Sequence, residues 1–115
     1  MPALSDQSLK TCNKKSVSLT DDEIYHHLEE LSDWKLTVEQ NIPKITKSYY
    51  FKNFISATQF ANEIAQLSES ENHHPRICIE WGKVSIEWWT HILSGLFIND
   101  FIMAARCDKT YQNLN

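Results

Sequence analysis

Three histidines, His73, His74 and His91, offer the chemistry that stands out most in this chain. The first two follow acidic residues in the stretch 68–75, and the third follows Thr90. An imidazole has an unperturbed pKa of about 6.5, so near neutral pH one ring can release a proton while another takes one up. These residue types therefore predict acid/base chemistry on a small molecule.

A predicted β-hairpin must bring these histidines together. Over residues 76–89 apolar side chains alternate with polar ones, which is typical of β-strands, and Gly82-Lys83 interrupts the alternation as a turn would. Two of the histidines precede the first strand and the third follows the second strand. Because the strands are antiparallel, all three are expected at the same end of the hairpin, where they can form one site.

The register of the hairpin decides which histidines meet. If Gly82-Lys83 forms the centre of the turn, His74 lies opposite His91, and directly opposed Cβ atoms are about 4.5–5.5 Å apart. If the turn lies one residue earlier, His73 lies opposite Thr90 instead. Strict alternation would place His73 on the other sheet face from His74 and His91. The spacing thus leaves open which two imidazoles face each other across a substrate.

Two other interpretations of these histidines compete with catalysis. The His pair could cap carbonyls at a helix end while His91 stands at the surface. A zinc site is the second, because the three histidines with Cys78 or a carboxylate could supply enough ligands. The chain has no His-x-His, His-Glu-x-x-His or paired-cysteine spacing, however. We therefore expect no metal.

Composition limits the class of protein. The 115 residues suit one domain, and we expect a flexible tail over residues 1–18, which adds little to the core, and a single domain over residues 19–115. The net charge of -4 and the scattered Lys and Arg residues argue against nucleic acid as a partner. No apolar run approaches the roughly 20 residues that span a bilayer, so we expect no membrane association. The three separated cysteines favour a reducing compartment, and we predict a cytoplasmic protein.

The remaining elements complete an α+β pattern. Thr20 with Glu23 matches a capping box at the start of a first helix, and Asn53 can cap a second helix that runs to about Ser70. Strand character appears at 34–36 and 45–51, and Asn99-Asp100 can cap a last helix. The predicted order is α-β-β-α-β-β-α, with a four-stranded antiparallel sheet that carries its helices on one face.

The chain resembles the pterin-4a-carbinolamine dehydratase family over roughly residues 19–108. The resemblance rests on several short motifs together: Glu69-Ser70-Glu71-Asn72-His73-His74-Pro75, Gly82-Lys83-Val84, Thr90-His91, Gly95-Leu96, Asn99-Asp100-Phe101 and Ala104-Ala105. It implies dehydration of 4a-hydroxytetrahydropterin to the quinonoid dihydropterin, which recycles the cofactor of aromatic amino-acid hydroxylases. It also implies a homodimer or homotetramer, and no metal or cofactor besides the pterin substrate.

The resemblance also implies roles for individual residues. His73 and His91 would be the acid/base pair, and His74 would bind or orient the pterin. Residues that would bind the substrate or support the site are Glu69, Pro75, Thr90, Asp100 and Trp34. In animals the family also serves as a dimerisation cofactor for a transcription factor, so a non-enzymatic binding or dimerisation module on the same scaffold is the alternative function. Turnover of the hydroxypterin would distinguish the two.

Overall fold

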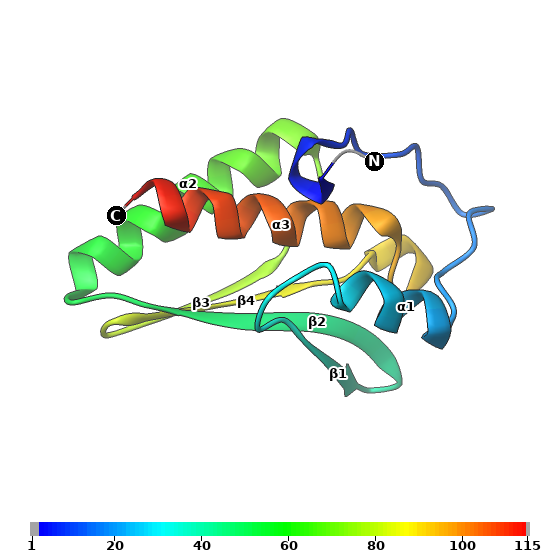
Figure 1. Cartoon of the computed structure of the whole chain (residues 1–115), viewed down its shortest axis with the longest axis horizontal. Coiled ribbons are helices and arrows are strands. Elements are labelled where there is room, and N and C mark those ends of the chain that lie inside the picture. Colours follow the sequence, from blue (N-terminus) through cyan, green and yellow to red (C-terminus); the bar gives the residue numbers. More distant parts are fainter. Residues whose placement is uncertain (1–2, 115) are drawn as a thin grey trace.

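Four antiparallel strands form one sheet in the order β1-β2-β4-β3 (Figure 1). The computed structural model describes residues 3–114. The strands are β1 (Lys35–Glu39), β2 (Ile42–Tyr50), β3 (Arg76–Glu80) and β4 (Lys83–Trp88). Pro43 lies inside β2, where it pairs with β1 only, since pairing with β4 begins at Ile45. The missing amide donor of Pro43 therefore interrupts no ladder in the centre of the sheet.

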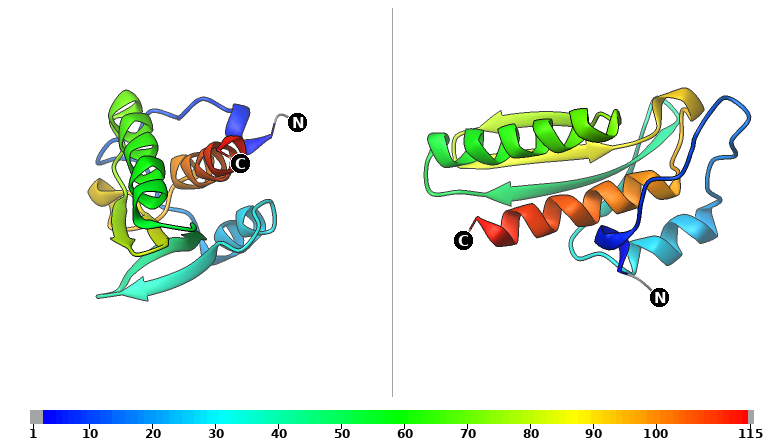
Figure 2. Two further views of the ribbon diagram at one scale, coloured as in Figure 1. Left: turned by 90° about the vertical axis from the view of Figure 1, so that its left-hand side faces the viewer. Right: turned by 90° about the horizontal axis from the view of Figure 1, so that it is seen from above.

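The helices pack against one face of this sheet (Figure 2). They are α1 (Asp21–Leu28), α2 (Phe54–Glu71) and α3 (Ile98–Asn113), and two short 3-10 helices span Leu4–Asp6 and His91–Leu93. Two of the predicted caps are confirmed: Thr20 and Glu23 form the capping box of α1, and the Asn53 side chain accepts from the amide of Ser56. The predicted cap of the last helix at Asn99-Asp100 is wrong in position, because α3 begins at Ile98 with Phe97 as its cap residue. The predicted α+β class and element order are confirmed as well.

The β3–β4 hairpin adopts the second of the two predicted registers. Ile77 pairs with Ile86 and Glu80 pairs with Lys83, so the turn lies at Trp81-Gly82 rather than at Gly82-Lys83. Gly82 has a φ of 67°, a left-handed conformation that glycine adopts without steric cost. The register that would set His74 opposite His91 is therefore wrong, because it places a side-chain-bearing residue where the backbone requires a positive φ.

Alternation along β2 and β4 buries one sheet face against α2 and α3. Ile45 and Tyr49 of β2 are buried, as are Val84, Ile86 and Trp88 of β4. Residues of the three helices complete this core: Ile24, Ala57, Phe60, Ala61, Ile64, Phe101, Ile102, Met103, Ala104 and Cys107. Removing this apolar surface from water is the main stabilisation of the fold. The same packing holds the first turn of α3 beside the end of β4.

The N-terminal segment departs from its expected role. It was expected to add little to the core, yet Leu4 is 5 % exposed and belongs to the core cluster. The segment runs across α3, as Figure 1 shows, and Arg106 of α3 donates to the carbonyl oxygens of Ser5 and Gln7. The expectation is wrong on this point because one buried leucine and a few backbone hydrogen bonds, which composition does not reveal, attach the segment to α3.

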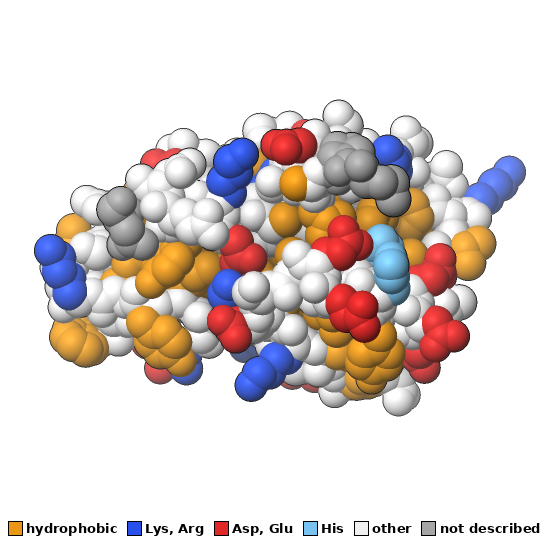
Figure 3. Space-filling model, viewed as in Figure 1, with side chains coloured by type: hydrophobic (Ala, Val, Ile, Leu, Met, Phe, Trp, Pro, Cys, Tyr) orange, Lys and Arg blue, Asp and Glu red, His pale blue; other side chains and the backbone are white. Residues whose placement is uncertain are grey.

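Two observations concern the surface of the described chain. On the face shown in Figure 3, Lys and Arg side chains are separated by acidic and apolar ones rather than gathered in a stripe. None of the helices in residues 3–114 has the length and apolar character that crossing a membrane requires. The exposed large apolar side chains include Trp81 at the β3–β4 turn, which is 73 % exposed.

Candidate active site

The His pair follows directly after the end of α2, and this helix end sets its position in the site. Asn72 caps the helix in a left-handed conformation with a φ of 51°, and the amide of His73 donates to the carbonyl of Ser68. This arrangement satisfies carbonyls of the last turn and reverses the chain. Pro75 follows, and proline disfavours a helical conformation for His74 before it. The chain is therefore extended when it enters β3 at Arg76.

A buried carboxylate in the first turn of α3 organises the centre of the site. Asp100 is 0 % exposed, and its Oδ2 accepts hydrogen bonds from the hydroxyl of Thr90 at 2.8 Å and from the amide of Phe97 at 2.9 Å. Its Oδ1 lies 2.6 Å from Nε2 of His73. The contact with Phe97 satisfies an amide donor at the helix start. Asp100 thus joins α3, the end of β4 and the His pair.

His73 is held on two sides. Its ring stacks on the indole of Trp88, with ring centroids 5.4 Å apart and planes inclined by 17°. Because the Asp100 carboxylate accepts hydrogen bonds, the contact places a proton on Nε2 of His73 and leaves the lone pair of Nδ1 for another partner. The His73 side chain is 14 % exposed. This arrangement is the carboxylate–imidazole pair that enzymes use to orient a base and stabilise its protonated form.

His74 and His91 lie nearer to solvent. Nε2 of His74 lies 2.5 Å from Oε2 of Glu69, and both side chains are at least half exposed. His91, in the short helix after β4, uses its Nε2 to donate to the backbone carbonyl of His74 at 3.3 Å. Its ring packs against Trp89 with centroids 4.5 Å apart. A donated Nε2–H leaves Nδ1 of His91 as its free lone pair.

All three imidazoles border one cavity of about 530 Å³. It is lined by Leu9, Lys10, Cys12, Glu71, Asn72, His73, His74, Thr90, His91, Ile92 and Asn99. A cavity of this size suits a small organic molecule. In residues 3–114, no three His, Cys, Asp or Glu side chains converge in a way that could hold a metal ion. The arrangement can thus donate and accept protons on a small substrate.

The predicted site residues fall into three groups. His73, His74, Thr90 and His91 line the cavity. Glu69 contacts His74, Pro75 shapes the chain beside it, and Asp100 is fully buried, so these three support the cavity from behind or beside it. Trp34 is not part of the cavity lining. It is buried and its indole donates to Asp108 instead.

Sequence reasoning missed the part of the cavity that the N-terminal segment and Asn99 contribute. Leu9, Lys10 and Cys12 lie in a segment without any recognisable pattern, so no signal indicated their position. Asn99 was noted only as a possible helix cap. Its position next to Asp100 in the same turn was the available signal, since neighbouring residues of one turn reach the same region.

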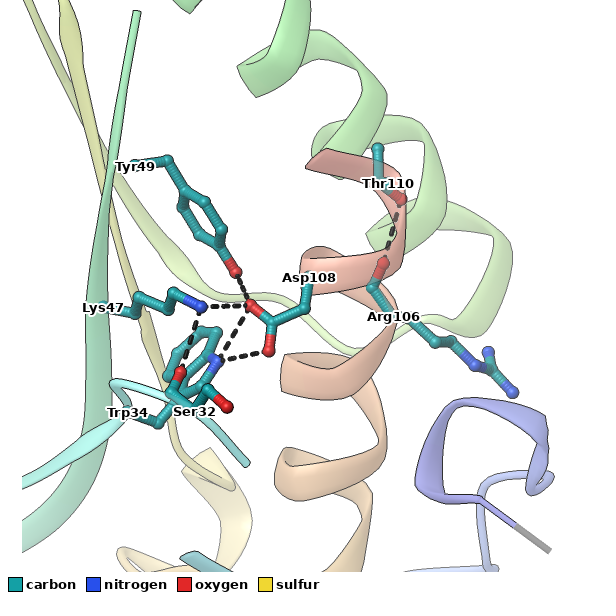
Figure 4. A network of polar contacts seen from close by, with 7 residues as sticks. All are labelled: Ser32, Trp34, Lys47, Tyr49, Arg106, Asp108 and Thr110. Atoms are coloured by element: carbon teal, nitrogen blue, oxygen red, sulfur yellow. Dashed lines mark hydrogen bonds and ion pairs between the residues drawn. The ribbon is translucent and has the colours of Figure 1, made fainter. Parts of the chain in front are cut away.

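Asp108 forms a second polar cluster on α3 (Figure 4). Its Oδ1 accepts from Nζ of Lys47 at 2.7 Å and from the hydroxyl of Tyr49 at 2.5 Å, and both carboxylate oxygens face the indole N–H of Trp34. Burial, and then the nearby Cys107 and Asp108, raise the pKa of the Tyr49 hydroxyl well above its usual value. Burial also raises the pKa of the Cys107 thiol to about 12.

Comparison with known proteins gives a consistent result. Residues 17–110 match the family model described as pterin 4 alpha carbinolamine dehydratase. A protein of Vibrio vulnificus (strain YJ016) named "Putative pterin-4-alpha-carbinolamine dehydratase" is 44 % identical over 106 residues, which cover 92 % of this chain and 96 % of that one. A protein of the same name from Marinobacter nauticus is 42 % identical and covers 96 % of this chain and 100 % of its own length.

Solved structures agree with the fold. A transcriptional coactivator/pterin dehydratase from Brucella melitensis matches with a TM-score of 0.75 and 27 % identity, and covers 83 % of this chain and 99 % of its own. A pterin dehydratase-like RuBisCO assembly factor of the alpha-carboxysome matches with a TM-score of 0.59 and 23 % identity, over 70 % of this chain and 90 % of its own. The second likeness concerns the fold alone.

Proposed function

The chain belongs to the pterin-4a-carbinolamine dehydratase family, and from this premise we propose that it dehydrates 4a-hydroxytetrahydropterin to the quinonoid dihydropterin. The observation that carries the proposal is the pair formed by His73 and the buried Asp100 at the wall of a cavity that His74 and His91 also line. A family name alone does not fix an activity, because scaffolds are reused without their chemistry. The oriented imidazole is a feature that a binding module would not need.

We assign to His73 the role of base. When Nδ1 of His73 accepts a ring N–H proton of the substrate, the ring becomes an imidazolium, and the adjacent Asp100 carboxylate stabilises that charge. The electron pair of the broken N–H bond stays in the pterin ring and forms part of the new double bond. Trp88 keeps the imidazole plane fixed during this step. No oxidant or reductant is required.

We assign to His91 the role of acid. In its protonated form, His91 gives a proton to the departing 4a-hydroxyl while the carbon–oxygen bond breaks, so the leaving group is neutral water. The backbone carbonyl of His74 holds the ring of His91 through Nε2, which leaves Nδ1 to face the substrate oxygen. The contact between Nε2 of His74 and Glu69 holds the His74 ring, to which we assign the role of orienting the pterin. Proton return between the two catalytic rings completes the cycle.

The test is turnover of a 4a-hydroxytetrahydropterin, followed as appearance of the quinonoid product. His73→Ala and His91→Ala should each lower kcat by about 10²–10⁴-fold, the usual contribution of one acid or base. His26→Ala is the matched control, because His26 is exposed on α1 and does not line the cavity. Circular dichroism should show all three variants folded. Turnover near the wild-type rate in both cavity variants would refute the mechanism.

The alternative is a binding or dimerisation module. A wild-type chain that binds the pterin without accelerating its dehydration, and that forms a stable complex with another protein, would favour this alternative. Supply of recycled cofactor to an aromatic amino-acid hydroxylase, and assembly into a homodimer or homotetramer, are further parts of our proposal. Sedimentation of the purified chain tests the assembly. Stimulation of a hydroxylase under turnover conditions tests the link to the pathway.

A further inference from the structure

We propose that residues 9–12 form a substrate-binding wall of the cavity, and that Asn99 is the positioning residue that holds this wall over the histidines. The inference rests on the proposed function, because it concerns how the same pterin is bound. Leu9, Lys10 and Cys12 line the cavity together with the three imidazoles. These residues precede residue 17, where the match to the family model begins. The wall is thus an addition to the matched part of the chain.

Asn99 binds the segment through a two-point contact. The amide of Lys10 donates to Oδ1 of Asn99 at 2.7 Å, and Nδ2 of Asn99 donates to the carbonyl of Lys10 at 2.8 Å. The two bonds fix the segment in one orientation, as a strand partner would. Asn99 is 6 % exposed, so water does not compete freely for these groups.

A second attachment holds the segment farther along α3. Arg106 donates from Nη2 to the carbonyl of Gln7 at 2.7 Å, and from Nη1 to Oε2 of Glu71 at 2.5 Å. Glu71 itself lines the cavity. Arg106 therefore ties the segment to the end of α2, just before the His pair. With Leu4 in the core, the segment is attached on both sides of residue 9.

These attachments separate binding from chemistry. The first turn of α3 carries Asp100, which contacts His73, and Asn99, which contacts the backbone of Lys10. Loss of the wall leaves the pairing of His73 with Asp100 in place and removes part of the surface that surrounds the substrate. Such a loss raises KM while kcat changes little, because uniform binding energy is removed.

The first experiment uses the cysteines as reporters. With a saturating 7,8-dihydropterin, alkylation of Cys12 by iodoacetamide should slow by about fivefold or more, because a bound ligand covers the wall. Cys78 lies on the opposite sheet face and should react at an unchanged rate. Peptide mass spectrometry measures both. If fluorescence quenching shows that the pterin is bound but Cys12 is not protected, the wall is overturned and the proposed function is not. If no pterin binds at all, the proposed function is overturned as well.

The second experiment removes the two-point contact between Asn99 and the backbone of Lys10. Asn99→Ala should raise KM about tenfold and leave kcat within about twofold, and Asn62→Ala, at an exposed position of α2, should alter neither. An equal fall of kcat and kcat/KM in Asn99→Ala would show an effect through Asp100 and overturn the role of Asn99. Should Asn99→Ala not fold, Cys12→Trp crowds the cavity without altering the contact between Asn99 and Lys10, and must raise KM where Cys78→Ser, on the opposite sheet face, does not. Equal KM values for these two variants would overturn the wall.

Discussion

Two carboxylates of α3, Asp100 and Asp108, lie eight residues apart in very different surroundings. Asp100 is fully buried and holds neutral donors together with a single imidazole, His73. Asp108 is partly shielded and holds a permanent cation, Lys47, together with a phenol and an indole (Figure 4). Only the cluster around Asp100 borders the histidine-lined cavity.

The difference separates a carboxylate that holds an imidazole at the cavity from a bracing carboxylate, one that only fastens two elements of the fold together. Lysine remains charged at neutral pH, so the charge balance around Asp108 does not change and the cluster fastens α3 to β2. The imidazole at Asp100 has two ring nitrogens, one held by the carboxylate and one left to exchange a proton with a substrate. Both clusters satisfy buried polar groups, but only one can take part in proton transfer. Substitutions at the two sites should therefore separate activity from stability.

The largest effect is expected from Asp100→Asn. The asparagine keeps the size of the side chain and removes the negative charge that stabilises protonated His73, so kcat should fall by about 10²–10³-fold. The pH dependence of kcat should also change, because Asp100 contacts the imidazole to which we assign the role of base. Stopped-flow assays across pH 5–9 measure both. An unchanged pH profile with a merely less stable protein would make Asp100 a bracing residue like Asp108.

Asp108→Asn should give the opposite result. Lys47 would lose its counter-charge while only 16 % of its side chain is exposed, and the free energy of unfolding should fall by about 2–3 kcal/mol, somewhat less than for a fully buried pair. The folded fraction should retain its kcat. Urea denaturation and dehydratase assays on one preparation provide the comparison. A large loss of kcat in fully folded Asp108→Asn would mean that the two clusters are not separate.

Tyr49 gives the bracing cluster a predicted response to alkali. Its pKa is raised in the folded state, so its contribution to stability is complete below the unfolded pKa of about 10 and is lost as the pH rises above that value. The free energy of unfolding should fall by up to about 1.4 kcal/mol per pH unit there. Tyr49→Phe should cost about 1.5 kcal/mol at pH 7 and reduce the alkaline slope. A slope that Tyr49→Phe leaves unaltered would contradict this prediction.

The smallest effect is expected from Thr90→Val. This variant keeps the shape of a buried side chain and removes the hydroxyl that donates to Asp100 at 2.8 Å. About 1 kcal/mol of stability should be lost, and weaker positioning of Asp100 should lower kcat by about 3–10-fold. Thermal denaturation and steady-state kinetics measure the two effects. Thr110→Val is a control on the same helix, since Thr110 donates to the backbone of Arg106 and not to either carboxylate.

The sequence was most informative where a local pattern acts alone. Capping at Thr20 and Asn53 depends on a few neighbouring residues, and those helix starts are confirmed. The hairpin register was left between two alternatives, because the apolar alternation fits both and only the backbone at Gly82 decides. The convergence of His73, His74 and His91 could be predicted from antiparallel pairing, since such pairing brings strand ends together whatever the register.

Contacts between distant segments could not be predicted in the same way. The attachment of Lys10 to Asn99 joins residues 89 apart, and the hydrogen bond from Trp34 to Asp108 joins residues 74 apart. No local rule relates such positions, and each depends on how α3 lies on the sheet. Trp34 is an example: the family resemblance placed it near the substrate, whereas in the structure its indole N–H donates to Asp108. Whether it affects catalysis stays a prediction.

The course of the N-terminal segment has a consequence for the evolution and engineering of this scaffold. The segment bonds to α3, where Arg106 also contacts the end of α2, whereas the groups to which we assign proton transfer lie outside the segment. Exchange of residues 3–16 for the corresponding stretch of a relative should transplant the preference for a pterin side chain and leave the reaction rate of a bound molecule as it was. New substrates could thus arise by replacement of this short N-terminal segment, with no change to the groups to which we assign proton transfer.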